Sequence, residues 1–297
     1  MKTPRDLNER TLADAWADLQ AHADAGLPLQ ADAFRLAFAD PEFLLRRETR
    51  GIRFQLELLK PELDQQDLGV DNTIVVFGSA RFVSRETAEQ QLAQARAGGD
   101  AQACKRAERE LRNAAYYEQA REFGRLVAEH SCRLPVGDRL YICTGGGPGI
   151  MEAANRGASE AGALNVGLNI ALPHEQFHNP YITPSLCFKF HYFALRKMHF
   201  MMRAKALVAF PGGFGTLDEL FEILTLVQTG KSEPVPVVLF GSEFWKRLID
   251  FDLLIEEGTI AASDLELFNL VDTPQQAWDV IQSFYRLENG QQQSAPP

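Results

Sequence analysis

Cysteine is scarce in this sequence: there are four in 297 residues, and no two of them form a CxxC pair. Without close, regular pairs the chain has neither a disulfide framework nor a cysteine-based zinc site. Histidine offers no metal site either, since His191 and His199 are eight residues apart with no carboxylate at ligand spacing. We therefore expect free thiols in a reducing, cytoplasmic protein that uses neither a metal nor another cofactor.

Long apolar runs and an excess of basic residues are also lacking. No run approaches the roughly 18 apolar residues of a membrane span, and the N-terminal stretch MKTPRDLNERTLADAW is too polar for a secretory signal. The 30 lysines and arginines are outnumbered by 40 aspartates and glutamates, and the resulting net charge of −10 repels polyanions. We expect no membrane and no nucleic-acid partner, whereas a small phosphorylated ligand needs only backbone N–H groups and a local cation.

What the chain does contain is an alternation of short apolar runs with helical segments. Thr73–Phe77 (TIVVF) is a β-branched run that ends at Gly78, and from residue 116 onward further apolar runs alternate with segments of helical pattern. Near-continuous apolar strands separated by helices predict an α/β fold, a Rossmann-like doubly wound parallel sheet with helices on both faces. The other expected strands are Arg139–Cys143, 164–171, Ala206–Phe210 and Val235–Phe240, and the expected helices are 116–130, 149–162, 191–204, 217–229, 242–256 and 274–287.

Three segments lie outside this alternation. Residues 1–70 predict a helical N-terminal extension, because 43–59 has a helical pattern and Leu12, Ala15, Trp16 and Leu19 recur at helical spacing. Pro61 and the acidic turn PELDQQD are expected to close this extension. Residues 84–113, broken by Ala97-Gly98-Gly99, predict a helical hairpin inserted in a nucleotide-binding domain of residues 71–290. The hairpin is either a partner-binding or lid arm or, as surface insertions more often are, a decoration. The polar tail 291–297 is expected to be disordered.

Three glycine-bearing loops follow expected strands and form the candidate ligand site. They are 78–81 (GSAR), 144–151 (TGGGPGIM) and 211–216 (PGGFGT). Ligands of open α/β sheets bind where the strands end, and a helix that begins after such a loop directs free N–H groups at an anion. One loop alone is often only a tight turn, but three in one sheet favour phosphate binding. The expected substrate-binding residues are Ser79, Thr144, Gly145, Gly146, Gly147, Gly149, Met151, Pro211, Gly212, Gly213, Phe214, Gly215 and Thr216.

The glycine spacing differs from that of two common nucleotide sites. GGGPG lacks the GxGxxG spacing of a dinucleotide site, and the next strand, ALNVGLNIAL, ends without an acidic residue to hold a ribose. Neither long loop is followed by the GK[ST] of a Walker A motif.

Three charged residues near these loops are candidates for binding or chemistry. Arg196 and Lys197 lie on the expected helix 191–204 among large apolar residues, so an inward-facing cation is plausible and Lys197 is expected to help bind the substrate. Glu219 ends a T-x-x-E sequence that predicts a capping box, with Thr216 as N-cap and Glu219 at N3. Catalysis by Glu219 is the alternative.

The two longer loops resemble those of a known family. TGGGPGIMEAANRGA together with FPGGFGTLDELFE is similar to the Lonely Guy (LOG) family, which comprises cytokinin-activating phosphoribohydrolases and bacterial relatives once labelled "lysine decarboxylase family". The motif PGGxGTxxE is complete from Pro211 to Glu219, and GGGPGxM is complete from Gly145 to Met151. The resemblance covers 73–80 and 114–285, whereas the extension and the hairpin have no counterpart in short plant-type members. Residues 174–190 look more like bacterial members than plant ones, which leaves the base specificity open.

The resemblance implies an enzyme whose catalytic pair is Arg196 and Glu219, 23 residues apart as in the family. The implied reaction hydrolyses the N-glycosidic bond of a nucleoside 5′-monophosphate, of the AMP or cytokinin riboside monophosphate type, to the free base and ribose 5-phosphate. Glu219 would stabilise an oxocarbenium-like centre or activate water. Arg196 would orient the phosphate or ribose, or polarise the base. The resemblance also implies a homodimer or higher homo-oligomer.

Two other functions remain open. A non-catalytic nucleotide or cofactor carrier, similar to molybdenum cofactor carrier proteins, would need the glycine loops but not the pair of Arg196 and Glu219. A regulatory sensor would report nucleotide binding to a partner through the hairpin. Lysine decarboxylation is rejected, because it normally needs a lysine that forms a Schiff base with pyridoxal phosphate, and Lys189, Lys197 and Lys205 have no such context.

Overall fold

The computed structural model describes residues 35–172 and 177–285 and a few positions between 14 and 26. The chain divides into two compact units, Met1–Leu63 and Asp64–Pro297. The helix expected around Leu12 to Leu19 and the disorder expected for the tail 291–297 lie outside the described residues.

The described part of the first unit is helical, as the sequence predicts for this region. It holds a 3-10 helix, η2 (Ala37–Ala39), the short α2 (Pro41–Leu45) and most of α3 (Arg50–Asp67). The prediction of a turn at Pro61 and PELDQQD is wrong, because α3 continues through Pro61 to Asp67. A proline removes one backbone hydrogen bond of the helix, and the remaining bonds of an 18-residue helix hold it together.

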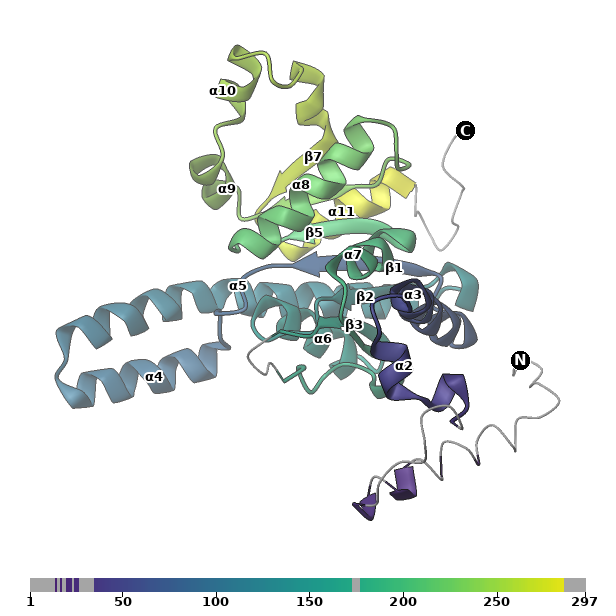
Figure 1. Ribbon diagram of the computed structural model, residues 1–297. Helices are drawn as coiled ribbons and strands as arrows, with labels where there is room; N and C mark the ends of the chain where they lie inside the picture. The colour runs from purple at the N-terminus through teal and green to yellow at the C-terminus, as the bar shows by residue number, and fades with distance from the viewer. Residues whose placement is uncertain are drawn as a thin grey trace. The chain divides into compact units, whose positions relative to one another are not determined.

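The second unit is built on a seven-stranded sheet in which all neighbouring strands run parallel (Figure 1). The strand order is β4-β3-β2-β1-β5-β6-β7, so the chain winds from the centre to one edge and then from the centre to the other. This order confirms the predicted doubly wound α/β fold. The strands are β1 (Asn72–Phe77), β2 (Leu140–Thr144), β3 (Asn165–Ile170), β4 (Cys187–Phe190), β5 (Ala204–Ala209), β6 (Val237–Phe240) and β7 (Phe268–Val271).

The sequence does not predict the two edge strands, β4 and β7. Each has only four residues and pairs with a single neighbour. An edge strand is not enclosed on both sides, so it tolerates polar residues such as Lys189 and Asn269 within its short apolar run.

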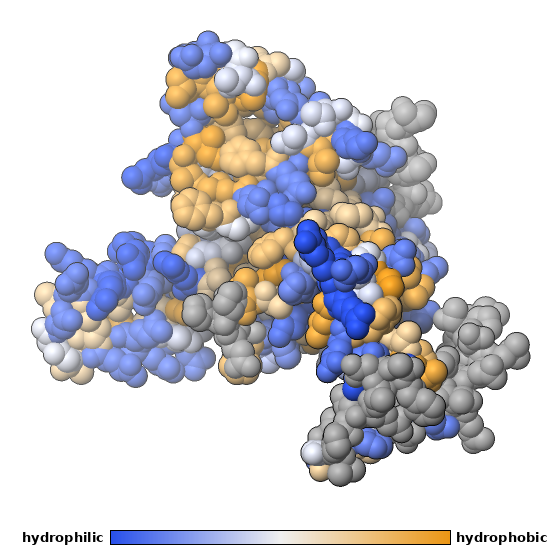
Figure 2. All heavy atoms as spheres, in the orientation of Figure 1, coloured by the Kyte–Doolittle hydropathy of each residue, from blue (hydrophilic) through white to orange (hydrophobic). Residues whose placement is uncertain are grey.

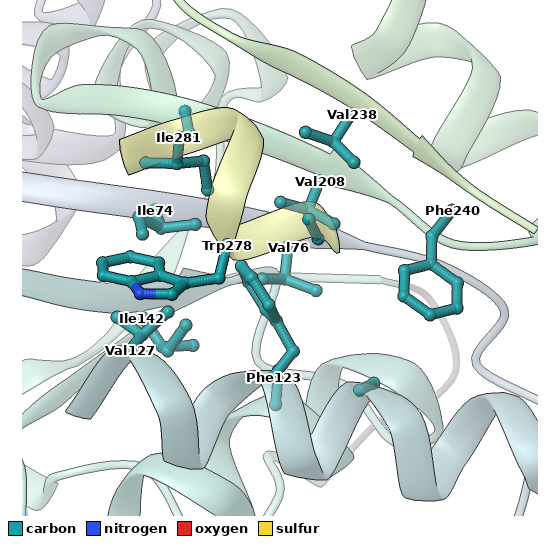
Figure 3. Packing of buried hydrophobic residues seen from close by; sticks show 14 of the residues in the cluster. Ile74, Val76, Phe123, Val127, Ile142, Val208, Val238, Phe240, Trp278 and Ile281 are labelled. Atoms are coloured by element: carbon teal, nitrogen blue, oxygen red, sulfur yellow. The ribbon is translucent and has the colours of Figure 1, made fainter. Parts of the chain in front are cut away.

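The sheet is covered on both faces, and each central strand contributes side chains to both cores, because successive residues of a strand point to opposite sides. In β1, Ile74 and Val76 pack with Phe123 and Trp278 in one cluster (Figure 3), whereas Val75 belongs to the cluster on the other face. Residues of α5 (Ala101–Ser131), α6 (Ile150–Glu160) and α11 (Pro274–Tyr285) contribute to the first cluster, and residues of α7 (Phe193–Met202), α8 (Phe214–Gln228) and α9 (Ser242–Leu248) contribute to the second.

The predicted helical hairpin is present, but its second helix does not end at residue 113. The helix α4 (Arg85–Gly98) is capped at its C-terminus by Gly99, which takes the left-handed conformation with φ 70° that glycine favours. The helix α5 then runs without a break for 31 residues, so the second arm of the hairpin and the expected core helix 116–130 are one element. In Figure 1, α4 and the first half of α5 extend away from the sheet.

The expected helix 242–256 is in fact two helices. It breaks after α9, and α10 (Phe251–Glu256) begins at Asp250, whose carboxylate accepts a hydrogen bond from the N–H of Leu253 at 3.1 Å. An aspartate that caps a new helix start makes the break favourable, and the apolar periodicity alone does not reveal it.

Candidate functional site

The strand order reverses between β1 and β5, and in such sheets ligands bind in the crevice at the carboxyl ends of these strands. A cleft of about 1260 Å³ lies there. Its lining comes from the loops after β1 and β5 and from the helices α5, α6, α7, α8 and α9. The cleft therefore receives side chains from helices on both faces of the sheet.

Backbone contacts join the three glycine-bearing loops. The N–H of Ser79 donates to the carbonyl of Pro211 at 2.9 Å, and the N–H of Ile150 donates to the carbonyl of Ser79 at 3.1 Å. Gly149 has φ 76°, and a Cβ there would lie 2.2 Å from the Ser79 carbonyl oxygen. Only glycine fits this position, so the loops after β1 and β2 approach more closely than other residues allow.

The loop 211–216 ends in an exposed helix N-terminus. Gly213 is the N-cap of α8, and the N–H groups of both Thr216 and Leu217 donate to its carbonyl. Among the described residues, no protein acceptor takes the N–H groups of Phe214 and Gly215. A Cβ built on Gly213 or Gly215 meets no atom within 4 Å, so the backbone here is open. Free N–H groups at the positive end of a helix form a site for an anion.

The predicted capping box is wrong. Because α8 begins at Phe214, Thr216 is its third residue and Glu219 its sixth, in the second turn of the helix. The Thr216 side chain packs on Gly212 instead, where a Cβ would lie 2.2 Å from its Oγ1. Glu219 is therefore too far along the helix to cap it, and its carboxylate is left for another role.

Glu219 is a buried carboxylate beside the cleft, with a side chain that is 8% exposed. Among the described residues it accepts no hydrogen bond, and its nearest cationic atom is Nη1 of Arg196, 3.9 Å from Oε1. Burial raises the pKa of Glu219 to about 7, and the positive charges of Lys197 and Arg196 oppose that rise without cancelling it. A carboxylate with a pKa near neutrality can take up and release a proton at physiological pH.

Arg196 faces inward from α7, as its apolar surroundings in the sequence suggest. Its side chain is 11% exposed, its Nε donates to the carbonyl of Leu168 at 2.6 Å, and its guanidinium lies 4.9 Å from the centre of the Phe200 ring. These contacts fix the guanidinium with Nη1 directed toward Glu219. A Cβ on Gly145 would lie 2.5 Å from Nη2, so the glycine makes room for the arginine.

Lys197 does not line the cleft. Its ammonium lies 2.9 Å from Oδ1 of Asp218 and 2.7 Å from Oε2 of Glu222, beside a separate hollow of about 510 Å³ that residues of α8 line. Figure 2 shows apolar side chains gathered over α8 and α9, in contrast to the hydrophilic hairpin. Lys197 therefore acts on the site through its charge, which lowers the pKa of Glu219.

The loop 144–149 is a supporting layer and does not line the cleft. Gly145 packs against Arg196, and Met151, which packs on Gly145 and Gly147, reaches the cleft lining in their place. The hydroxyl of Thr144 donates to Oδ1 of Asn155 at 2.6 Å and accepts from the N–H of Gly146 at 3.0 Å. Both expected catalytic residues, Arg196 and Glu219, line the cleft, and of the expected binding residues Ser79, Met151 and Pro211 to Thr216 do so.

Buried amides hold this supporting loop in place. Nδ2 of Asn179 donates to the carbonyls of Gly146 and Gly147 at 3.3 and 3.1 Å and to Oδ1 of Asn155 at 3.0 Å. Nδ2 of Asn155 donates to Oδ1 of Asn165 at 2.9 Å. Sequence reasoning misses these residues. The one feature of the sequence that could have indicated them is Asn155, a polar residue on the apolar face of its helix.

Sequence reasoning also misses the wall of the cleft that α5 and the loop after β1 supply. Arg81, Phe82, Arg112, Asn113 and Tyr116 line it, and α9 adds Phe244 and Arg247. No motif marks these positions, since α5 enters the site only through its place on the sheet. Among the described residues, no group of three or more His, Cys, Asp or Glu side chains is arranged to hold a metal ion. No described helix is both long enough and apolar enough to cross a membrane.

Known proteins resemble this chain in sequence. A family model described as "Possible lysine decarboxylase" matches residues 151–281. Two rice proteins (Oryza sativa subsp. japonica) are among the curated relatives. A cytokinin riboside 5′-monophosphate phosphoribohydrolase is 29% identical over 50% of this chain and 59% of its own length. A probable enzyme of the same name is 31% identical over 30% of this chain and 43% of its own length. The chain thus spans less than two thirds of the length of these relatives.

Solved structures resemble the chain in fold. The molybdenum cofactor carrier protein of Chlamydomonas reinhardtii has a TM-score of 0.41 and 20% identity, over 72% of this chain and 97% of that chain. The molybdenum cofactor binding protein of Rippkaea orientalis has a TM-score of 0.43 and 17% identity, over 71% of this chain and 94% of that chain.

Proposed function

We propose that the chain is a member of the LOG family and an N-glycosidic hydrolase that converts a nucleoside 5′-monophosphate and water into a free base and ribose 5-phosphate. The observation that carries this proposal is the buried carboxylate of Glu219, 3.9 Å from the Arg196 guanidinium and on the same cleft as the open N-terminus of α8. AMP and cytokinin riboside monophosphates are the first substrates to test, because the relatives are named for the latter.

The 5′-phosphate binds at the start of α8. The N–H groups of Phe214 and Gly215 and the positive end of the helix attract an anion without any need for a positively charged protein. This local attraction is compatible with the net charge of −10. Binding the phosphate holds the ribose beside Glu219, which is deeper in the cleft and on the same helix.

The ribose lies against Arg196 and Glu219, on the cleft side of the pair, when the bond breaks. As the bond between C1′ and the base nitrogen lengthens, positive charge develops on the sugar, and the ionised Glu219 carboxylate stabilises it. Glu219 takes a proton from the attacking water, whose oxygen forms the new bond to C1′, and the proton passes on to the departing base. The positive charges of Lys197 and Arg196 keep Glu219 partly ionised despite its burial, and Arg196 orients the ribose.

The test is an incubation of the pure protein with each common nucleoside monophosphate and a cytokinin nucleotide, followed by chromatography for free base. We expect Glu219→Gln to lower turnover by about 10²-fold or more, because glutamine cannot accept a proton or carry a negative charge. Glu222→Gln is the matched control, since Glu222 lies one turn further along α8, pairs with Lys197 and does not line the cleft. Its turnover should stay near that of the wild type.

Tight nucleotide binding without turnover by the wild type would contradict hydrolysis and favour the carrier function instead.

We further propose that the protein is a cytoplasmic homodimer. Light scattering on the purified protein at several concentrations tests the oligomeric state.

A further inference from the structure

Five residues of the cleft lining come from elements other than α7 and α8, which carry the catalytic pair. They are Arg81 and Phe82 from the loop after β1 and Arg112, Asn113 and Tyr116 from α5. We call them the aromatic–arginine wall. Phe82 and Tyr116 pack on the core beneath α5, α6 and α11, whereas α7 and α8, which carry Arg196 and Glu219, cover the other face of the sheet. A nucleotide whose ribose lies at Glu219 therefore has this wall available on its other side.

The wall contains two stacked aromatic rings. The centres of the Phe82 and Tyr116 rings are 5.9 Å apart, and the ring planes differ by 18°. Tyr116 also packs on the loop after β6, where a Cβ on Gly241 would lie 2.9 Å from its Cε1. Both rings are half-buried and line the cleft. Flat aromatic surfaces of this kind are what nucleobases stack on.

The wall also contains two guanidinium groups without a carboxylate partner. Within the described part of the chain, neither Arg81 nor Arg112 forms an ion pair, although the protein has ten more acidic than basic residues. By comparison, Arg96 on the same hairpin pairs with Glu108 at 3.9 Å. A guanidinium donates hydrogen bonds and accepts none. A guanidinium can therefore donate two hydrogen bonds to the edge of a nucleobase that presents two neighbouring acceptors.

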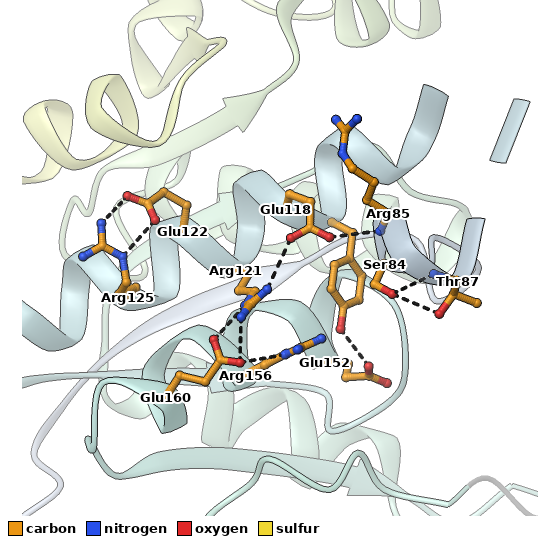
Figure 4. Close-up of polar contacts among 11 residues, drawn as sticks. Ser84, Arg85, Thr87, Glu118, Arg121, Glu122, Arg125, Glu152, Arg156 and Glu160 are labelled. Carbon is orange, nitrogen blue, oxygen red and sulfur yellow. Dashed lines mark hydrogen bonds and ion pairs between the residues drawn. The ribbon is translucent and has the colours of Figure 1, made fainter. Parts of the chain in front are cut away.

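The wall stands on a firmly held part of α5. The hydroxyl of Tyr117 donates to Oε1 of Glu152 at 2.8 Å, and the backbone N–H of Arg85 donates to Oε1 of Glu118 at 3.0 Å. Figure 4 shows Glu118 between Arg85 and Arg121. This part of α5 is thus held to α6 and to the start of α4, while the rest of the hairpin extends beyond it.

We propose that the aromatic–arginine wall is the nucleobase subsite of the cleft, and that it favours a 6-oxopurine over a 6-aminopurine. The proposal rests on the proposed function and names the base on which that function acts. A 6-oxopurine presents O6 and N7, two neighbouring acceptors, to Arg112 or Arg81. A 6-aminopurine presents a donor at position 6, which faces the donors of the arginine and leaves them unpaired. The hairpin that carries Arg112 is then a specificity element of the site.

The experiment measures kcat/KM for GMP, IMP and AMP on the full chain by release of ribose 5-phosphate, which all three share as product. Calorimetry of GMP and AMP binding to Glu219→Gln measures base preference without turnover. We expect GMP and IMP to exceed AMP by about tenfold or more in both measurements, the scale of one bidentate contact between arginine and base. Arg112→Ala and Arg81→Ala should reduce that preference and leave AMP nearly unchanged. Tyr116→Ala should weaken all three nucleotides alike.

Arg96→Ala is the control, since its side chain is 65% exposed and does not line the cleft. Equal binding of GMP and AMP, or tighter binding of AMP, would overturn the proposal. So would an equal loss for all nucleotides in Arg112→Ala, because it would mean that the arginine holds the phosphate. If no nucleotide is hydrolysed, the proposed function fails, but the binding preference and its loss in Arg112→Ala still decide whether the wall selects the base.

Discussion

At the scale of single residues, Glu219 connects burial with reactivity. Its pKa of about 7, set by burial, means that about half of the molecules carry the charged form at neutral pH. Stabilising positive charge at C1′ and accepting a proton both need that charged form. We therefore expect kcat to rise with pH through about 7 and to level off above it, as measured at saturating substrate. A kcat that falls over this range would assign Glu219 to the role of a proton donor instead.

The same pKa makes a prediction about stability. The folded-state pKa of about 7 lies above the ordinary value of 4.5, so the folded protein holds this proton more tightly than the unfolded chain does. The resulting stabilisation is full below pH 4.5 and is lost as pH rises through 7. Glu219→Gln should therefore be more stable than wild type at pH 8 by about 3 kcal/mol, since a tenfold change in proton affinity corresponds to about 1.4 kcal/mol. At pH 5 the gain should be much smaller. Urea unfolding at the two pH values checks this difference.

Arg196 performs two tasks that a lysine cannot combine. Its Nε holds the Leu168 carbonyl while Nη1 faces Glu219. Lysine keeps the positive charge but has one nitrogen, so Arg196→Lys must give up one of the two contacts. We expect turnover to fall by about 10²-fold while the variant still folds, as measured by initial rates and circular dichroism. A near-normal rate would mean that only the charge of Arg196 matters.

At the scale of elements, the packing of α5 on α6 depends on two glycines. A Cβ on Gly157 would lie 1.8 Å from the Arg121 carbonyl oxygen, and a Cβ on Gly124 would lie 2.3 Å from the Ala154 carbonyl oxygen. Gly157→Ala should therefore destabilise the fold by about 1 to 3 kcal/mol, the usual cost of overpacking, as thermal or urea unfolding will measure. Gly98→Ala, where a Cβ meets no atom within 4 Å, is the matched control and should stabilise α4 slightly. Equal effects of the two substitutions would contradict this packing.

The sequence pattern predicts some of the helices and strands and misses others. The central strands are buried on both faces, so their apolar runs are long enough to predict β1, β2, β3, β5 and β6. The edge strands and the break between α9 and α10 depend on pairing and capping, to which apolar periodicity does not respond. The start of α8 is a similar case: T-x-x-E fits a capping box, but glycine and phenylalanine begin the helix earlier. Because the helix begins at Phe214, Glu219 lies in its second turn and cannot be the capping residue that the sequence predicts.

At the scale of the whole molecule, the cleft is assembled from segments that are far apart in the sequence. The glycine loops and the inward-facing Arg196 could be predicted, because a motif or an apolar helix marks each of them. The aromatic–arginine wall and the amides around Asn155 could not, because their roles follow from the strand order and from the continuity of α5. Local pattern thus identifies the residues that carry the chemistry, and topology decides which residues surround the substrate.

The central claim is that this cleft hydrolyses a nucleotide that it holds by the 5′-phosphate. The most direct test compares a nucleoside 5′-monophosphate with the same nucleoside lacking the phosphate, at equal concentrations, by chromatography of the released base. We expect base and ribose 5-phosphate in equal amounts from the monophosphate, and a rate lower by about 10²-fold or more for the nucleoside, because phosphate binding positions the sugar at Glu219. Equal turnover of the two compounds, or release of base from neither, would contradict the account.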